Sequence, residues 1–255
     1  MAAYGYRIDL PNPKDFNFRD LFQRLTQAKV KMAAGADVDL RPYTTPSNQY
    51  SLSSCVGNAT ADSVEILNTI DGKPRVELSR LFVYAMARIQ HNELANDGGT
   101  YIRTAFYTLS KFGVCSEAIW PYNTKKVLTS PSIMAQREAL GHKIHSFYRI
   151  DSQGQQRVEE ITAALRSYHP VVFGTKVAKP FMAVSNLTPV KEPSKGIVGG
   201  HAMIIVGRLG NNFLVKNSWG TRWGTNGFCL MTPSYLAWNG THDLWVPTLG
   251  AAFKK

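Results

Sequence analysis

In the first half of the chain, apolar side chains recur every three or four residues, which is the spacing of one face of an α-helix. The pattern predicts helices over residues 17–28, 54–70, 79–96 and 99–113. In the last of these, Ala105, Leu109 and Phe112 are expected to be buried. Gly72 and Gly113 close the second and fourth helices, because glycine adopts the left-handed conformation at a helix end without strain.

The second half of the chain changes character. One amphipathic stretch predicts a helix over residues 155–167, and runs rich in β-branched and aromatic residues predict strands around it. The strands are expected over residues 142–150, 170–177, 201–208, 212–217 and 227–232, with a hairpin at Gly210-Asn211. A helical lobe at about 48–140, followed by a mostly antiparallel β lobe at about 141–250, is an α+β arrangement. The seam between the lobes is a natural place for a cleft.

Residues 1–36 stand apart from the domain that we expect over residues 37–255. Pro11 and Pro13 exclude a regular helix from the stretch before residue 17. A short amphipathic helix follows, and the small residues 33–36 indicate a joint. The extension therefore combines an extended stretch that is rich in aromatic residues with one helix.

Composition narrows the class of protein. A hydrophobic fraction of 44% and a charged fraction of 18% are typical of a soluble globular chain. The chain contains no run of 18 apolar residues, so no membrane-spanning helix is predicted. The first residues lack the basic and apolar segments of a secretory signal. Cys55, Cys115 and Cys229 are too few for a disulfide framework, which favours a reducing compartment such as the cytoplasm.

The net charge of +11 is concentrated in one half of the chain. Residues 141–255 carry thirteen basic and five acidic side chains, a surplus of eight. A solvated basic surface explains this surplus, and attraction of acidic substrates, nucleic acid or anionic lipid is the alternative. No polybasic run interleaved with aromatic residues indicates nucleic-acid binding.

Cys55 lies where the second predicted helix begins, directly after two serines that could cap it. The amide groups of a first helical turn are unpaired and the helix dipole is positive there, so a thiolate is stabilised. A single cysteine at a helix start is nevertheless more often ordinary packing. Its interpretation as a nucleophile needs a base.

His201 supplies the candidate base. It opens an apolar strand that a short hairpin joins to the strand ending at Asn217. Adjacent antiparallel strands could bring the Asn217 amide beside the imidazole and hold the ring with its other nitrogen toward the thiol. Trp219 would then cover this contact and keep water away.

Gln49 lies six residues before Cys55. Its side-chain amide and the backbone N–H of Cys55 could both donate to a developing oxyanion. Removal of one such donor typically costs about 2.7–4 kcal/mol of transition-state stabilisation.

These residues give the chain its resemblance to papain-like cysteine peptidases. The stretches that carry the resemblance stand in the order of that family. They are Gln49 and Cys55 six apart, Asp97-Gly98-Gly99, Trp120-Pro121-Tyr122, Gly200-His201-Ala202, and Lys216-Asn217-Ser218-Trp219-Gly220 with Trp223-Gly224. The resemblance extends from about residue 38 to 246, and the asparagine–tryptophan stretch is its most specific part.

The resemblance implies a two-lobed fold and hydrolysis of peptide bonds through a thioester, without metal or organic cofactor. By the same resemblance, Gly98, Gly99, Gly200 and Trp219 would contact a peptide or protein substrate bound to a monomer. Residues 1–36 would correspond to a much shortened propeptide that blocks the cleft. An extra structural element packed elsewhere on the domain explains them equally well.

The cysteine segment departs from the familiar family pattern. Leu52 stands where many members have a disulfide cysteine, and Val56 replaces the usual tryptophan or tyrosine. The segment is closer to disulfide-free microbial or viral branches. Two alternatives to an active peptidase stay open. One is a catalytically weak homologue that acts as a binding module, and the other is a thiol-dependent cell-wall amidase or transpeptidase.

Overall fold

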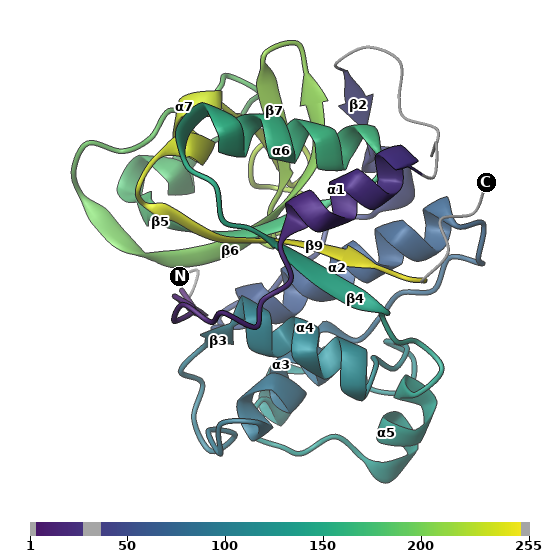
Figure 1. Cartoon of the computed structure of the whole chain (residues 1–255). Helices are drawn as coiled ribbons and strands as arrows, with labels where there is room; N and C mark the ends of the chain where they lie inside the picture. Colours follow the sequence, from purple (N-terminus) through teal and green to yellow (C-terminus); the bar gives the residue numbers. More distant parts are fainter. Residues whose placement is uncertain (1–3, 28–36, 251–255) are drawn as a thin grey trace.

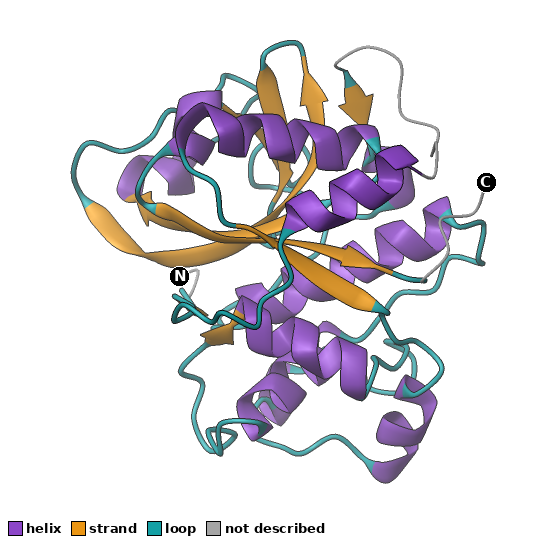
Figure 2. Ribbon diagram, in the orientation of Figure 1, coloured by secondary structure: helices purple, strands orange, loops and turns teal. Residues whose placement is uncertain are grey.

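The computed structural model describes residues 4–27 and 37–250, and a helical part and a β part pack side by side in it (Figures 1 and 2). The helices are α1 (Phe18–Gln27), α2 (Cys55–Ile70), α3 (Arg80–Ile89), α4 (Ile102–Lys111), α5 (Ile133–Ala139), α6 (Gly154–Arg166) and α7 (Pro233–Ala237). The strands are β1 (Tyr6–Arg7), β2 (Val38–Asp39), β3 (Thr100–Tyr101), β4 (Ser146–Ile150), β5 (Val171–Ala178), β6 (Ile197–Leu209), β7 (Asn212–Lys216), β8 (Phe228–Met231) and β9 (Thr241–Thr248). The predicted α+β class is confirmed.

The β lobe is built on one antiparallel sheet. Its strand order is β4-β9-β5-β6-β7-β8, and β2 pairs with the far part of β6. The predicted hairpin is present, because β6 ends at Leu209, Gly210 has a φ of +56° and β7 begins at Asn212. This hairpin places the start of β6 and the residues after β7 next to each other.

Helix α2 forms the core of the boundary between the lobes, with the sheet on one side and α3 and α4 on the other (Figure 1). Residues 55–67 are all buried. Its small-to-apolar stripe permits this close packing, since a Cβ on Gly57 would lie 2.7 Å from the Arg80 carbonyl oxygen. The helix start is therefore fixed against both lobes.

Some predicted boundaries and burials are wrong. The helix expected to reach residue 96 ends at Ile89, because Arg88 donates to the carbonyls of Leu94 and Asn96 and fixes the following residues as a loop. Phe112 is 36% exposed rather than buried, since it follows the last turn of α4. The pattern did not predict α5, α7 or β9.

The N-terminal segment, defined here as residues 4–16, runs through the seam between the lobes before α1 begins (Figure 1). β1 pairs in parallel with β3 of the helical lobe. At the other end, the Arg149 backbone N–H donates to the Phe16 carbonyl at 2.7 Å, and α1 packs against β4 and α6. The predicted joint at residues 33–36 lies outside the described residues.

No helix in the described part of the chain is long and apolar enough to cross a membrane.

Candidate active site

Cys55 is the first residue of α2 and is fully buried. Ser54 occupies the N-cap position, but its side chain does not cap the helix as the sequence suggested. Its hydroxyl lies 2.5 Å from the Tyr122 hydroxyl and accepts from the Asn58 amide at 3.2 Å. The first-turn amides therefore remain oriented toward the thiol end of the helix, where they favour negative charge.

The imidazole of His201 and the amide of Asn217 lie in direct contact across the hairpin. His201 Nε2 is 2.7 Å from Asn217 Oδ1, and the Ser218 backbone N–H donates to the same oxygen at 2.7 Å. Because an amide oxygen can only accept hydrogen bonds, the hydrogen between Nε2 and Oδ1 must be carried by Nε2. A neutral ring then has its lone pair on Nδ1, the nitrogen that a base uses.

Nδ1 of His201 is buried and has no hydrogen-bond partner among the described residues. The backbone N–H of the next residue, Ala202, is one of the groups that favour a charged Cys55 sulfur, so the thiol lies beside this part of β6. A buried polar nitrogen without a hydrogen-bond partner carries a free-energy cost, so its presence needs an explanation. A ring nitrogen with an available lone pair is what a base for the Cys55 thiol would need.

Burial controls the protonation of both groups. It raises the pKa of the Cys55 thiol to about 11, against the opposing effect of the Ala202 and Gly5 backbone N–H groups. It also lowers the pKa of His201 to about 4, and the bond to Asn217 only partly offsets this. With the N-terminal segment in place, the pair is therefore an uncharged thiol and an uncharged imidazole near neutral pH.

Trp219 packs on the histidine as the sequence suggested. The ring centroids of His201 and Trp219 are 4.7 Å apart, with an interplanar angle of 31°. Phe181 and Trp223 support the indole from behind, at centroid distances of 5.5 and 5.6 Å. This aromatic group shields the histidine–asparagine contact from water.

Gln49 is fully buried and tied to both lobes. Its Oε1 accepts from the Ser218 hydroxyl at 2.7 Å, which orients the amide, and its Nε2 donates to the Leu52 carbonyl at 2.7 Å. An amide nitrogen carries two hydrogens, so donation to Leu52 is compatible with donation to an oxyanion beside Cys55.

Gly98 and Gly99 belong to a loop that is fastened to the start of α2. The Asp97 carboxylate accepts from the Ser53 backbone N–H, with both oxygens at 3.1 Å, and from the Tyr84 hydroxyl at 2.6 Å. A Cβ on Gly99 would lie 2.1 Å from the Gly5 carbonyl oxygen, and its φ is +80°. Only glycine permits this close approach of the Gly5 backbone.

The first described residues occupy the space around the predicted catalytic groups. Tyr4 lies edge-on to both His201 and Trp219, with ring centroids 6.4 Å apart in each case. Gly5, the next residue, lies at Cys55 with its backbone N–H toward the thiol. The Gly5 carbonyl accepts from the Thr100 backbone N–H at 2.9 Å. A Cβ on Gly5 would lie only 1.7 Å from the Ser53 carbonyl oxygen.

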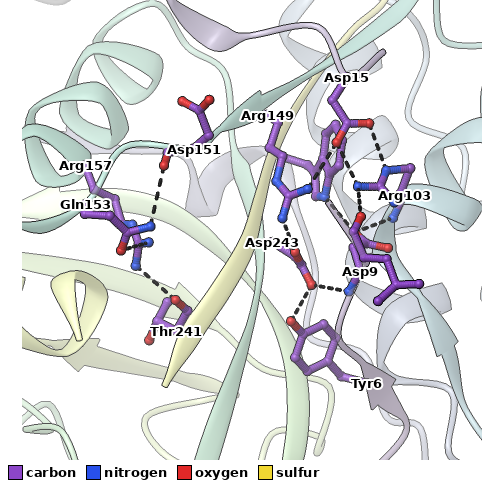
Figure 3. Close-up of polar contacts among 12 residues, drawn as sticks. Tyr6, Asp9, Asp15, Arg103, Arg149, Asp151, Gln153, Arg157, Thr241 and Asp243 are labelled. Carbon is purple, nitrogen blue, oxygen red and sulfur yellow. Dashed lines mark hydrogen bonds and ion pairs between the residues drawn. The ribbon is translucent and has the colours of Figure 1, made fainter. Parts of the chain in front are cut away.

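Tyr6 projects into the β lobe, where a buried polar network holds it (Figure 3). Its hydroxyl donates to Asp243 Oδ2 at 2.6 Å, and the Asp9 backbone N–H donates to the same oxygen at 2.7 Å. Arg149 donates to Asp243 Oδ1 at 2.7 Å, and Asp15 accepts from Arg149 at 3.1 Å. The sequence analysis did not identify any of these residues, since nothing in their local pattern distinguishes them.

A buried ion pair joins the lobes beneath the site. Lys216, the residue before Asn217, contacts the Asp62 carboxylate, and the side chains are 0% and 5% exposed. Asp62 lies on α2 two turns after Cys55 and also accepts from the Ser47 hydroxyl. The pair therefore links the helix that carries the thiol to the strand that leads to the asparagine.

Within residues 4–27 and 37–250, no group of three or more histidine, cysteine, aspartate or glutamate side chains is arranged to hold a metal ion. All three cysteines are buried free thiols.

Comparison with known proteins identifies the family. The model of the papain family of cysteine proteases matches residues 35–240. An uncharacterized peptidase C1-like protein of Acanthamoeba polyphaga mimivirus is 34% identical over 267 residues, which cover 95% of this chain and 86% of the viral protein. Cysteine proteinase 3 of Dictyostelium discoideum is 25% identical over 222 residues, and the match covers 85% of this chain and 64% of that protein.

Solved structures agree on the fold. Xylellain, a cysteine protease from Xylella fastidiosa, superposes with a TM-score of 0.85 at 26% identity, over 98% of this chain and 97% of xylellain. Procathepsin B S9 from Trypanosoma congolense gives a TM-score of 0.75 at 16% identity, over 97% and 87% of the two chains, and its likeness concerns the fold alone. The chain belongs to the papain family of cysteine proteases, a family of thiol-dependent hydrolases.

Proposed function

We propose that this protein is a cysteine peptidase in which Cys55, His201, Asn217 and Gln49 hydrolyse peptide bonds through a thioester, and that residues 4–16 hold the folded chain latent. The observation that carries the first part is the orientation of the imidazole. Asn217 fixes Nε2 as the donor, so the buried Nδ1, which has no hydrogen-bond partner among the described residues, is the acceptor.

In the proposed reaction, His201 Nδ1 takes the thiol proton and the Cys55 sulfur attacks the substrate carbonyl carbon. The Cys55 backbone N–H and the Gln49 amide would donate to the oxyanion that forms. His201 then protonates the leaving amine, and a thioester remains on the sulfur. Water, deprotonated by the same imidazole, attacks the thioester and releases the acid with the free thiol.

Latency is supported by the direction and chemistry of the segment at the thiol. The Gly5 carbonyl faces Thr100, whereas its N–H lies toward the Cys55 sulfur. A nucleophile that meets an N–H instead of a carbonyl carbon has nothing to attack. Tyr4 covers His201, and burial keeps the thiol and imidazole uncharged. The segment therefore blocks the site without being a substrate for it.

An epoxide probe that alkylates active-site thiols tests the peptidase. Full-length protein is incubated with the probe for hours, and labelled peptides are mapped by mass spectrometry alongside hydrolysis of a peptide library. We expect labelling at Cys55 and not at Cys115, with loss of labelling in Cys55→Ser and strong slowing in His201→Ala.

Each alternative has its own outcome in the same experiment. Labelling at Cys55 without hydrolysis of any peptide, but with release of product from peptidoglycan, would identify a cell-wall amidase. Neither labelling nor hydrolysis in folded protein, including variants that displace the segment, would leave the binding-module interpretation.

A further inference from the structure

We propose that Asp97 is a positioning residue of the peptidase reaction, whose carboxylate holds the turn before Cys55 in the shape that aims the Gln49 amide at the oxyanion. The inference rests on the proposed peptidase function. It assigns a role to a carboxylate that acts through the backbone of Ser53.

The turn of residues 49–54 lies between the two groups that would donate to the oxyanion. Gln49 opens the turn, and the backbone N–H of Cys55 follows its last residue. Tyr50, within the turn, has a φ of +51°, a strained conformation for a bulky side chain. A strained turn keeps its shape only where contacts from outside hold it. The direction of the Gln49 amide therefore depends on what holds the turn.

The peptide unit between Leu52 and Ser53 connects Gln49 to Asp97. Its C=O accepts from Gln49 Nε2 at 2.7 Å, and its N–H donates to both Asp97 oxygens, each at 3.1 Å. The unit is planar and carries these two groups on opposite edges, so it cannot rotate without losing both interactions. A carboxylate acceptor also polarises the unit, which strengthens the bond that its carbonyl accepts. Asp97 therefore fixes the Gln49 amide through one peptide unit.

Asp97 is itself held in place by the helical lobe. The Tyr84 hydroxyl donates to Asp97 Oδ1 at 2.6 Å and accepts from the Gly99 backbone N–H at 3.0 Å. The Arg88 guanidinium lies 4.0 Å from the centroid of the Tyr84 ring and donates to the Asn96 carbonyl at 2.5 Å. Arg88 is fully buried, so these contacts lie in a packed part of the lobe. The carboxylate can therefore serve as a fixed point for the turn.

The thiol and the imidazole do not depend on this contact. Cys55 begins α2, whose residues 55–67 are buried, and His201 is oriented by Asn217. Loss of the Asp97 contact should impair a step in which a carbonyl oxygen gains charge. It should spare attack of the sulfur on a saturated carbon, where no oxyanion forms. This difference separates a positioning role from a general loss of structure.

The experiment measures two rates in each full-length protein. One is kcat/KM for the peptide anilide that the enzyme cleaves fastest, and the other is the second-order rate of iodoacetamide alkylation at Cys55, in which the sulfur displaces iodide. Both reactions need the open site, so the ratio of the two rates does not depend on the open fraction. Each variant is made in the wild-type chain and in Tyr6→Phe, which loses the bond to Asp243 and should open more often.

Asp97→Asn is the diagnostic variant, because it keeps the size of the side chain but turns one of the two oxygens at the Ser53 N–H into a donor. We expect the ratio of hydrolysis to alkylation to fall on the order of 10- to 100-fold, as for an oxyanion donor misplaced by about 1 Å. Tyr84→Phe keeps the Ser53 contacts but releases the carboxylate, and should lower the ratio less. Asp151→Asn, at a carboxylate 55% exposed, is the control and should leave the ratio unchanged.

A ratio in folded Asp97→Asn equal to that of its parent would overturn the proposal, whether both rates fall together or neither changes. If Asp97→Asn does not fold, Tyr84→Phe answers the question, and an unchanged ratio there has the same meaning. Absence of hydrolysis in the parent chain and in Tyr6→Phe, with Cys55 still alkylated, would refute the peptidase instead.

Discussion

Replacement of Gly5 by alanine tests whether the N-terminal segment closes the site. The new Cβ would lie 1.7 Å from the Ser53 carbonyl oxygen. Cβ atoms in proteins do not approach other heavy atoms closer than 3.0 Å, so one of the two partners must move by about 1.3 Å. Ser53 is held by both oxygens of Asp97. The segment is therefore the part that moves.

The size of the effect follows from the contacts that are lost. If the segment lifts, it loses the bond from Thr100 N to Gly5 O, worth about 1 kcal/mol, and the bond from Tyr6 to the Asp243 carboxylate, worth about 1.5–3 kcal/mol. A total of about 2.5–4 kcal/mol corresponds to a roughly 100- to 1,000-fold larger open fraction. The alkylation rate of Cys55 and kcat/KM should rise together.

The assay is the second-order rate of iodoacetamide alkylation at Cys55, followed by mass spectrometry at pH 7.5. Gly141→Ala is the matched control, because its nearest atom to a new Cβ is 3.4 Å away and its φ is not positive. If folded Gly5→Ala is alkylated no faster than Gly141→Ala, the segment does not control access to the thiol and the latency argument is wrong.

Three further outcomes are expected. Burial, together with Asp243, raises the pKa of Asp9 to about 7 in the closed chain, so closure is strongest at acidic pH and weakens as the pH rises through that value. The Cys55 alkylation rate of Asp9→Asn, divided by that of wild type, should then be well below one near pH 8 and rise toward one near pH 4. A ratio that does not vary with pH would contradict this. In an open variant, Asn217→Ala should lower kcat/KM on the order of 10- to 100-fold, less than Cys55→Ala does, because it removes the orientation of the base and not the nucleophile; equal losses in the two folded variants would show that orientation is not its role. Lys216→Met should destabilise the fold by about 3–5 kcal/mol in denaturant unfolding, because it leaves the Asp62 charge buried, and addition of Asp62→Leu should recover most of that loss; no recovery would mean that the pair is not the source of the cost.

The local sequence pattern was sufficient to predict the helix and the strands that carry the predicted catalytic groups. The apolar stripe predicted α2, and Gly210-Asn211 predicted the β6–β7 hairpin that brings Asn217 to His201. In both cases the deciding information lies within a few residues of sequence. The resemblance to a known family added the expected partners of each group, and the match to the papain family model confirms the family.

Elements whose stability comes from distant contacts were missed. β9 is a central strand between β4 and β5, yet it contains Pro247 and an aspartate with positive φ, which are local arguments against a strand. α5 buries only two alanines, Ala135 and Ala139, and its Ile133 is 71% exposed, so its sequence gives a weak helical pattern. Likewise, Tyr6 and Asp243 lie 237 positions apart, so only the folded chain brings the hydroxyl to the carboxylate.

The buried, protonated state of Cys55 also bears on how the protein survives oxidants. Peroxides react with exposed thiolates, and the products beyond sulfenic acid are not readily reversed. In the closed chain the Cys55 sulfur is 0% exposed and its pKa is about 11, so it offers peroxide neither charge nor access. If the N-terminal segment keeps substrates out as proposed, it would also protect the Cys55 thiol from oxidation until the site opens.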